Sequence, residues 1–407
     1  MKTIPQHTVY LQDNTLCNFR KRIWRNAKSL LSCFSGITDP RKKRGIRFEL
    51  SLIMFILFAG ITSGSTTLKD CHLWALYNRR FLRKYFSLLH GIPDPTTISY
   101  LLRKLDPDEV VLAYTLFIHL LGFELGNVVS LDAKTMRAVI GDDAIRHILS
   151  LFSHLTHTVR GQIGVNQKEN EIPAFRRLLK NLNGQVTGFL FLADALHAQK
   201  DTVRAILEAL ADYLLVIKGN QKDFYEAILM AFTDQPDLPG TNYPSLVKDI
   251  YTEEQLTRKR NITTTTTASN DAKLCSYLIE QHGFIGLKTV GVLKRSGTRT
   301  LKDGTVAPLT ETVCFASSRI LTAKQLMKLL RNHWCIENNL HWVKDFVFLE
   351  DRQTLRSGNA PQIMSFLRSM CISIFNLLKF RSISDAIHNF EKSKRIHYQF
   401  FKMAAIV

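Results

Sequence analysis

The sequence has no apolar run long enough to cross a membrane. Its longest such run, from Leu50 to Ile61, is interrupted by Ser51, and a spanning helix needs ~20 apolar residues. The opening residues 1–6 lack the apolar core of a secretory signal. The 7 cysteines are scattered and never spaced CxxC, so they predict neither a disulfide framework nor a zinc site. We therefore expect a cytoplasmic protein with reduced thiols and no membrane association.

Acidic residues are scarce beside basic ones. The chain of 407 residues has 54 Lys and Arg against 35 Asp and Glu, which leaves a net charge of +19. A charge excess of this kind fits a partner with a dense negative field. Nucleic acid is the first candidate, and a membrane surface is the alternative. The hydrophobic content of 45% is ordinary for a globular protein, and the length allows two or three domains.

Three of the acidic residues stand at informative places. Asp132 ends the run Val128–Leu131, Asp194 ends the run Phe189–Ala193, and Glu337 lies in a helical-looking stretch. Open α/β sheets place their chemistry at the carboxyl ends of strands. Taken alone, an aspartate at a strand end is more often a turn or helix cap. Together, the three carboxylates predict a cluster that holds Mg²⁺ or Mn²⁺ beside a phosphodiester.

Residues 1–120 are expected to form a helical, basic region that binds DNA. Clusters of Lys and Arg alternate there with Trp, Tyr and Phe, and aromatic rings among basic side chains suit nucleic acid. The alternative is a helical bundle whose charges form a solvated face. The basic clusters are Arg20–Lys21–Arg22, Arg41–Lys42–Lys43–Arg44, Arg79–Arg80 and Arg83–Lys84.

Residues 125–222 follow a β-β-β-α-β-α-β order, which is that of the ribonuclease-H-like fold. In that fold the first and fourth strands are parallel neighbours, so their carboxyl ends would bring Asp132 and Asp194 together. Asn170 as N-cap and Pro173 in the first turn mark the start of one helix. The expected strands are 127–132, 147–153, 158–165, 188–193 and 212–217, and the expected helices are 171–182 and 198–210.

The rest of the chain divides into three parts. Residues 223–312 are expected to form a β-rich insertion, because they contain several prolines and the threonine run 263–267, which favours extended structure. Residues 313–378 are expected to complete the catalytic domain with the Glu337 helix, and a basic tail, 379–407, follows. The predicted fold class is therefore α/β: a mixed sheet with flanking helices, a β-rich insertion and an N-terminal helical region.

The three carboxylates suit a two-metal mechanism. Two divalent ions about 3.5–4 Å apart can activate a nucleophile and stabilise a leaving group at phosphorus. Hard cations prefer carboxylate oxygen, and Mg²⁺ keeps several of its waters. We therefore expect Asp132 to bridge two Mg²⁺ or Mn²⁺ ions, Asp194 to hold one of them and Glu337 the other.

A helical face around Glu337 is expected to contact the substrate. At 100° per residue, His333, His341 and Lys344 share this face with Glu337. Lys344 and His341 are placed to contact the phosphate or to steer the leaving group, although a histidine such as His341, taken singly, is more often a surface or satisfied core residue than a metal ligand. The aromatic residues that border the face and that could stack on a base are Trp334 and Trp342.

Several segments together resemble one family, the H-repeat-associated, ISAs-type insertion-sequence transposases of the DDE superfamily. The likeness runs in the right order from about residue 40 to 375, and its longer motifs are specific. The segments are LDAKTMR at 131–137, ADALHAQ at 193–199, VIKGNQ at 216–221 and HWCIENNLHW at 333–342, with shorter matches at 168–175 and 91–93.

The resemblance implies a ribonuclease-H-like catalytic domain in which Asp132, Asp194 and Glu337 match the family's DDE triad. Lys344 stands where related transposases carry the Lys of a Tyr-Arg-Glu-Lys signature, whereas His333 replaces the Arg of that signature. Ala133 replaces the usual Gly of the first motif, and the usual His-Gly-Arg element of the insertion is missing. Further DNA contacts are expected at Lys134, Arg137, Lys218, Gln221, and at Arg41, Lys42, Lys43 and Arg44.

The sequence thus predicts a DDE transposase associated with the nucleoid. It would bind the terminal inverted repeats of its element in double-stranded DNA, cut at the element ends and join the freed 3′ hydroxyl to target DNA. By analogy, a homodimer is expected on two DNA ends. A domesticated, catalytically silent DNA-binding relative is the alternative that His333 and Ala133 leave open. The charge of +19 argues against a two-carboxylate glycosidase.

Overall fold

The computed structural model describes residues 29–392, except 121–122, 138, 140–144, 167–169, 183, 234–246, 258–259, 302 and 304. The basic cluster predicted at 20–22 and most of the predicted basic tail lie outside the described residues. Contacts divide the chain into two compact units. Among the described residues, the sheet unit lies within residues 125–137 and 145–343, and the helical unit lies within residues 29–124, 139 and 344–392. None of the described helices is long and apolar enough to cross a membrane.

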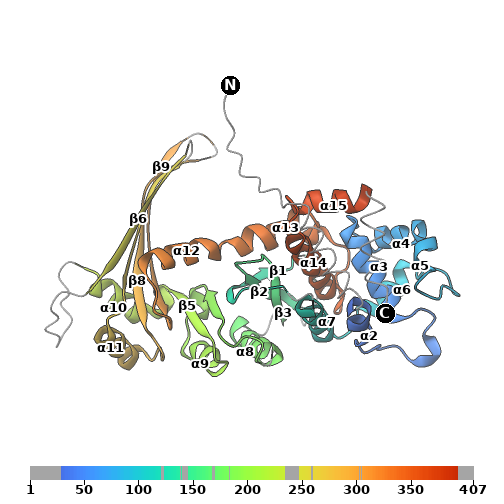
Figure 1. Cartoon of the computed structure of the whole chain (residues 1–407), viewed down its shortest axis with the longest axis horizontal. Coiled ribbons are helices and arrows are strands. Elements are labelled where there is room, and N and C mark those ends of the chain that lie inside the picture. Colours follow the sequence, from blue (N-terminus) through green and yellow to red (C-terminus); the bar gives the residue numbers. More distant parts are fainter. Residues whose placement is uncertain are drawn as a thin grey trace. The chain divides into compact units, whose positions relative to one another are not determined.

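The described part of the sheet unit contains one nine-stranded mixed sheet (Figure 1), in the order β3-β2-β1-β4-β5-β9-β8-β7-β6. Its first five strands have the order expected for a ribonuclease-H-like fold. β1 is antiparallel to β2 and parallel to β4, which confirms the predicted neighbourhood of the first and fourth strands. The strands are β1 (Val128–Thr135), β2 (Ile145–Ser153), β3 (Val159–Asn166), β4 (Leu190–Ala193), β5 (Asp212–Ile217), β6 (Asp249–Thr257), β7 (Arg260–Ser269), β8 (Thr289–Thr300) and β9 (Val306–Ser317).

Four helices cover one face of this sheet. Successive side chains of a strand point to opposite faces, and in β1 the buried Val129 and Leu131 both join the core on this side. α8 contributes Phe175 and Leu178 to the same core, three residues apart and therefore on one face of the helix. The helices are α8 (Glu171–Leu182), α9 (Lys200–Glu208), α10 (Lys222–Ala231) and α11 (Ala272–His282).

The opposite face of the sheet is covered by α12 (Ala323–His333), which contacts β4, β6 and β7 (Figure 1). Thr322 begins this helix with a capping box, because its side chain accepts from the Gln325 N–H while the Gln325 side chain accepts from the Thr322 N–H. Leu326 and Leu330 then pack against apolar residues of the sheet. A π-helical turn, Glu337–His341, and α13 (Trp342–Phe346) follow. This helix therefore brings the Glu337 segment to the sheet.

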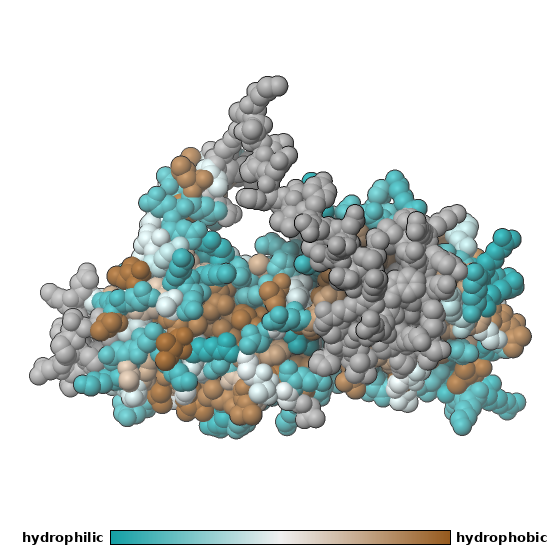
Figure 2. Space-filling model, in the orientation of Figure 1, coloured by the Kyte–Doolittle hydropathy of each residue, from teal (hydrophilic) through white to brown (hydrophobic). Residues whose placement is uncertain are grey.

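The segment expected as a β-rich insertion extends the same sheet. β9 pairs with β5 in antiparallel register, with Leu214 opposite Ser317, and β8, β7 and β6 follow outward. Their outer parts project as a β arm (Figure 1). Hydrophobic residues are exposed near its tip among hydrophilic ones (Figure 2), and they include Leu301 and Val306. The strand β9 runs from Val306 to Ser317 and therefore crosses the expected boundary between residues 312 and 313.

The helical unit is organised around two helices that are buried along almost their whole length, α3 and α14. A helix that is apolar on all sides suits the centre of a bundle, and α3 packs against α2, α4 and α14. Residues 344–392 share this unit with residues 29–120, so the compact units divide the chain differently from the expected boundaries. The helices are α2 (Ser29–Ser35), α3 (Leu50–Thr62), α4 (Leu68–Tyr77), α5 (Arg79–Leu82), α6 (Pro95–Leu102), α7 (Pro107–Leu120), α14 (Ala360–Leu377) and α15 (Ile383–Lys392).

The sheet unit has no room for a side chain at Gly291 in β8. A Cβ there would lie 2.4 Å from the carbonyl oxygen of Thr267 and 2.5 Å from a ring carbon of Phe315. Both atoms are held by neighbouring strands, so we expect Gly291→Ala to lower the free energy of unfolding by about 1–3 kcal/mol, as overpacking does. Urea unfolding measures this, with Gly219→Ala as control because its Cβ would meet nothing within 4 Å. Unchanged stability of Gly291→Ala would contradict this close approach.

Candidate metal centre

The strand register places Asp132 and Asp194 side by side. Leu131 of β1 is paired with Ala193 of the parallel strand β4, and the two aspartates are the next residues of their chains. Leu131 and Ala193 both point into the core beneath α8 and α9. Because successive side chains alternate between the faces, Asp132 points to the other face, on which α12 lies.

Glu337 reaches the same place from the segment after α12. Residues 337–341 form a π-helical turn, in which the Trp342 N–H donates to the Glu337 carbonyl, and such turns are frequent at functional sites. The turn places His341 Nδ1 3.8 Å from Glu337 Oε2 and 3.4 Å from Asp132 Oδ2. Asp132, Glu337 and His341 each offer one ligand atom, and these atoms all lie within 4.8 Å of one another. The sequence predicted the two carboxylates, and it predicted His341 at the same face.

The three carboxylates differ in their electrostatic surroundings. Burial raises the pKa of Asp132, although the nearby His341 opposes that shift. The pKa of Asp194 is lowered, first by a hydrogen bond from His333, and its side chain is 63% exposed. A hydrogen bond from His341 lowers the pKa of Glu337. Of the three, Asp132 is therefore the carboxylate whose ionised form most requires a nearby cation.

A buried histidine stands behind Asp194. His333, the last residue of α12, has Nε2 3.3 Å from Asp194 Oδ1 and Nδ1 3.0 Å from Ser130 Oγ. Ser130 Oγ also lies 2.7 Å from His154 Nε2. Ser130 and His154 were not predicted from the sequence as site residues. A signal existed for Ser130, because it stands two residues before Asp132 in a strand and therefore shares its face.

The residues expected as DNA contacts have different surroundings. Lys218 is exposed, and its charge contributes to the lowered pKa of Asp194, so it lies near that carboxylate. Arg137 is also exposed. Lys134 is buried, with Nζ 3.4 Å from a neighbouring backbone carbonyl oxygen. Gln221 donates from Nε2 to a backbone carbonyl at 3.0 Å. Lys218 and Arg137 are therefore the accessible members of this group.

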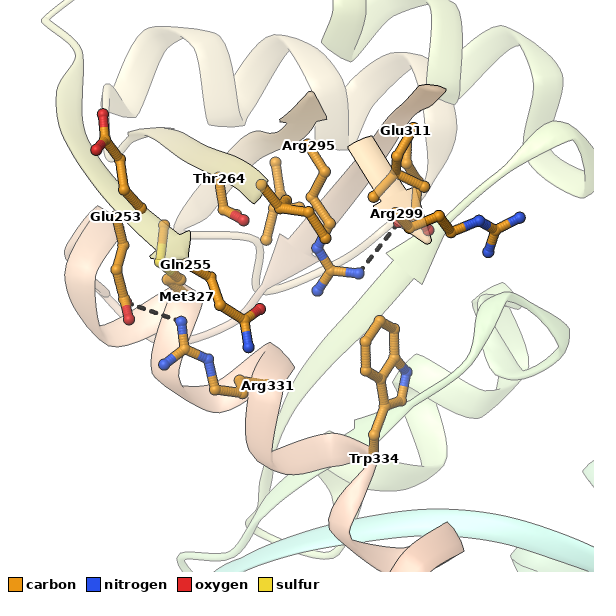
Figure 3. Close-up of a pocket in the computed structure, with 13 residues that line it drawn as sticks. Glu253, Gln255, Thr264, Arg295, Arg299, Glu311, Met327, Arg331 and Trp334 are labelled. Atoms are coloured by element: carbon orange, nitrogen blue, oxygen red, sulfur yellow. Dashed lines mark hydrogen bonds and ion pairs between the residues drawn. The ribbon is translucent and has the colours of Figure 1, made fainter. Parts of the chain in front are cut away.

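Trp334 lines a cavity of about 480 Å³ between the β arm and α12 (Figure 3). Its side chain is 49% exposed, and the guanidinium of Arg295 lies 4.5 Å from the ring centroid. Arg295 pairs with Glu311 at 3.1 Å, and Arg331 pairs with Glu253 at 2.8 Å. The cavity thus presents an aromatic ring framed by ion pairs, and the Arg295 guanidinium lies over that ring in a cation–π contact.

Lys344 lies in the helical unit and is fully buried. Its Nζ donates to Ser365 Oγ at 2.9 Å, and Ser365 Oγ donates to Glu350 Oε1 at 3.3 Å. Glu350 is also bonded to the buried Arg368. Lys344 thus belongs to a buried polar network, and its contact with a phosphate stays a prediction. Trp342, the second predicted stacking residue, is 52% exposed.

The basic cluster at residues 41–44 has one paired and three exposed members. Arg41 pairs with Asp39 at 2.6 Å and donates to the Phe48 carbonyl at 2.7 Å, so its guanidinium braces the loop before α3. Lys42, Lys43 and Arg44 are exposed. These three are the accessible positive charges of the predicted DNA-binding cluster.

Comparisons with known proteins agree with this architecture. A family model described as "Transposase DDE domain" matches residues 126–374, and one described as "DDE_Tnp_1-associated" matches residues 31–118. The chain is 29% identical over 355 residues to the "H repeat-associated putative transposase YhhI" of Escherichia coli K12, covering 85% of this chain and 90% of that protein. It is 28% identical over 354 residues to the "Putative transposase YncI" of Escherichia coli O157:H7, covering 85% and 87%.

The opposite pKa shifts of Asp132 and Asp194 give opposite predictions for the metal-free protein. Asp132→Asn removes a charge that burial disfavours, so we expect a higher Tm at neutral pH, by about 2–4 °C for each kcal/mol gained. This gain should shrink as the pH falls from the raised pKa towards the ordinary value of 3.8, because the wild-type Asp132 is then also protonated.

Asp194→Asn is the matched control. It removes a charge that His333 stabilises, so the Tm should fall at neutral pH. The difference from wild type should fade as the pH falls from 3.8 through the lowered pKa of Asp194. Thermal unfolding of both variants in EDTA across this pH range measures the two effects. A lower Tm for Asp132→Asn at neutral pH would contradict the assigned role of burial.

Proposed function

The chain belongs to the transposase DDE domain family, and from this premise we propose that it cuts double-stranded DNA at the ends of its own element and joins those ends to target DNA. In this proposal Asp132, Asp194 and Glu337 are the metal-binding carboxylates. The observation that carries the proposal is the convergence of the three carboxylates where the carboxyl end of β4 lies beside the middle of β1. They come from positions 132, 194 and 337 of the chain, and only a folded sheet with α12 across it unites them.

The donor set fits a divalent cation. Asp132 and Glu337 supply carboxylate oxygens, which hard cations such as Mg²⁺ and Mn²⁺ prefer, and a ligand atom of each lies within 4.8 Å of the other's. Burial raises the pKa of Asp132, and the neighbouring Glu337 adds to this shift, so a bound cation would stabilise the ionised carboxylate. Asp194 is held by His333 beside this pair. A bound cation would supply Lewis-acid stabilisation of the phosphorane-like charge and of the leaving oxygen.

The side chains of this chain then perform three tasks. His341 Nδ1, beside both Asp132 and Glu337, holds these carboxylates in place. The exposed Lys218 places a positive charge near Asp194, where a DNA phosphate would approach. Trp334 offers a half-exposed ring for stacking on a base beside the cut. The chemistry occurs in two displacements at phosphorus. Water first displaces the 3′ oxygen at the element end, and the resulting 3′ hydroxyl then displaces a 3′ oxygen in target DNA.

Binding of the terminal inverted repeats is assigned to the helical unit. Its cluster Lys42–Lys43–Arg44 is exposed, and the net charge of +19 favours a polyanion. Two element ends must be joined to the target together, which leads us to propose a homodimer in the DNA complex. A catalytically silent DNA-binding relative is the second candidate. It is favoured by one observation: His333, at the place where related signatures carry Arg, contacts Asp194 and is buried.

A cleavage assay tests the proposal. Plasmid DNA with the sequences that flank this gene is incubated with the full chain and Mg²⁺ or Mn²⁺, with EDTA as blank. We expect cuts at the element boundary, and a loss of at least about 10²-fold in rate for Glu337→Gln and Asp194→Ala, because each removes a metal-binding charge. DNA binding should be retained in both variants. DNA binding without any cut by the wild type would favour the catalytically silent relative. Full activity of either variant would contradict the proposed mechanism.

Salt dependence tests the assignment of DNA binding to the exposed cluster. The logarithm of the binding constant should fall linearly with the logarithm of salt concentration, and replacing Lys42, Lys43 and Arg44 together by Ala should reduce that slope by about one unit per lost phosphate contact. The control removes the same charge from the face of the sheet opposite α12, by replacing Lys180, Lys222 and Lys273, which are exposed on α8, α10 and α11. Equal slopes for the two triple variants would contradict the assignment.

A further inference from the structure

We propose that Ser130 and His154 are positioning residues that hold the His333 ring against Asp194 and so fix the orientation of that carboxylate. Four side chains form a continuous row. His154 Nε2 lies 2.7 Å from Ser130 Oγ, Ser130 Oγ lies 3.0 Å from His333 Nδ1, and His333 Nε2 lies 3.3 Å from Asp194 Oδ1. The row of contacts does not depend on the proposed function. Its effect on metal binding rests on that function.

Four elements of the sheet unit build this row, and Asp194 is contributed by the end of β4. Ser130 lies in β1, fully buried, on the face opposite Val129 and Leu131. His154 follows the end of β2, and its N–H donates to the Val128 carbonyl at 3.0 Å, which ties it beside the start of β1. His333 closes α12 and is 5% exposed. The ring of His333 is thus held between the sheet and the carboxylate.

Burial keeps the ring of His154, at one end of the row, neutral at neutral pH. Desolvation, with a further contribution from the nearby His333, lowers the pKa of His154 to about 4. Within the described part of the chain, its buried Nδ1 has no hydrogen-bond partner. A buried N–H without an acceptor is rarer than a buried acceptor without a donor, so Nδ1 is the bare nitrogen. Nε2 therefore has the proton and donates it to Ser130 Oγ.

The Ser130 hydroxyl has one proton, and the acceptor of that proton bears on which ring nitrogens of His333 are protonated. Ser130 Oγ lies 3.0 Å from His333 Nδ1 and 3.2 Å from the His333 carbonyl oxygen, and it can donate to only one of them. Donation to Nδ1 leaves the ring proton on Nε2, which faces Asp194. Donation to the carbonyl requires a proton on Nδ1, and the ring then keeps an N–H towards Asp194 only when Nε2 is protonated as well. A neutral ring with the proton on Nδ1 alone would turn a lone pair towards the carboxylate, so both favourable arrangements place the Nε2–H of His333 against Asp194.

The contact of the His333 Nε2–H with Asp194 has a consequence for the metal centre. The Nε2–H of His333 satisfies Asp194 Oδ1 and prevents that carboxylate from rotating freely, although its side chain is 63% exposed. Hydrogen bonds that orient a ligand from behind commonly change metal affinity by about 10–100-fold. Ser130 and His154 touch neither substrate nor cation in this scheme, so they act through His333 alone.

Nitrogen NMR of the full chain with ¹⁵N-labelled histidine tests the row directly, because protonated and bare ring nitrogens have distinct shifts. At neutral pH, His154 should show a protonated Nε2 and a bare Nδ1, and His333 should show a protonated Nε2. His72 is an internal reference with the opposite pattern, since its Nδ1 lies 2.9 Å from the Pro93 carbonyl and must donate to it. In Ser130→Ala the His333 signals should move towards a mixture of tautomers, and Ser130→Thr, which keeps the hydroxyl, should restore them. A bare Nε2 on His333 in the wild type would overturn the proposal.

Mn²⁺ binding, measured by electron paramagnetic resonance without DNA, tests whether the row affects metal affinity. We expect Ser130→Ala and His154→Phe to weaken Mn²⁺ binding by about 10-fold and His154→Gln, whose amide can donate to Ser130, to lose less. Ser130→Thr should bind as the wild type does. Equal affinity in wild type and Ser130→Ala would overturn the positioning role. A wild type that binds no Mn²⁺ but shows the expected tautomers would instead refute the proposed function and leave the hydrogen-bond row intact.

Discussion

The parallel pairing of β1 with β4 is the constraint on which the site depends. It sets Leu131 opposite Ala193 and leaves Asp132 and Asp194 as neighbours on two adjacent interior strands, Asp132 within β1 and Asp194 directly after β4. Two carboxylates in such proximity repel each other, and their surroundings respond in different ways. Burial raises the pKa of Asp132, while the contact with His333 lowers that of Asp194. His333 beside Asp194 and His341 beside Asp132, both on the α12 side, therefore offset this repulsion, which the sheet itself does not.

The extension of the sheet is what brings these histidines into place. β9 continues the sheet beyond β5, and β8, β7 and β6 widen it further, so α12 has a long apolar surface on which to lie. The helix ends at His333, and the π-helical turn that follows directs Glu337 and His341 to Asp132. The insertion therefore helps to build the site, because α12, which positions Glu337, packs against the insertion strands β6 and β7.

The catalytic sheet could be predicted because local patterns and topology agree there. The helix at 171–182 and the strand at 212–217 have the predicted bounds, and the neighbourhood of Asp132 and Asp194 follows from strand order alone. The helix face around Glu337 was less predictable, because a spacing of 100° per residue assumes an α-helix. The π-helical turn changes that spacing, and Lys344 is bonded to Ser365 in the helical unit.

The sequence by itself determined the family resemblance, the β-β-β-α-β-α-β order and the three carboxylates, since these depend on local periodicity and on motifs of a few residues. Only the tertiary structure decided that Ser130 and His154 stand behind His333, and that Arg295 lies over Trp334. Such contacts join residues that are distant in the chain and come from different elements. Their distances depend on how β1, β2, β8 and α12 pack, and no local pattern encodes that packing.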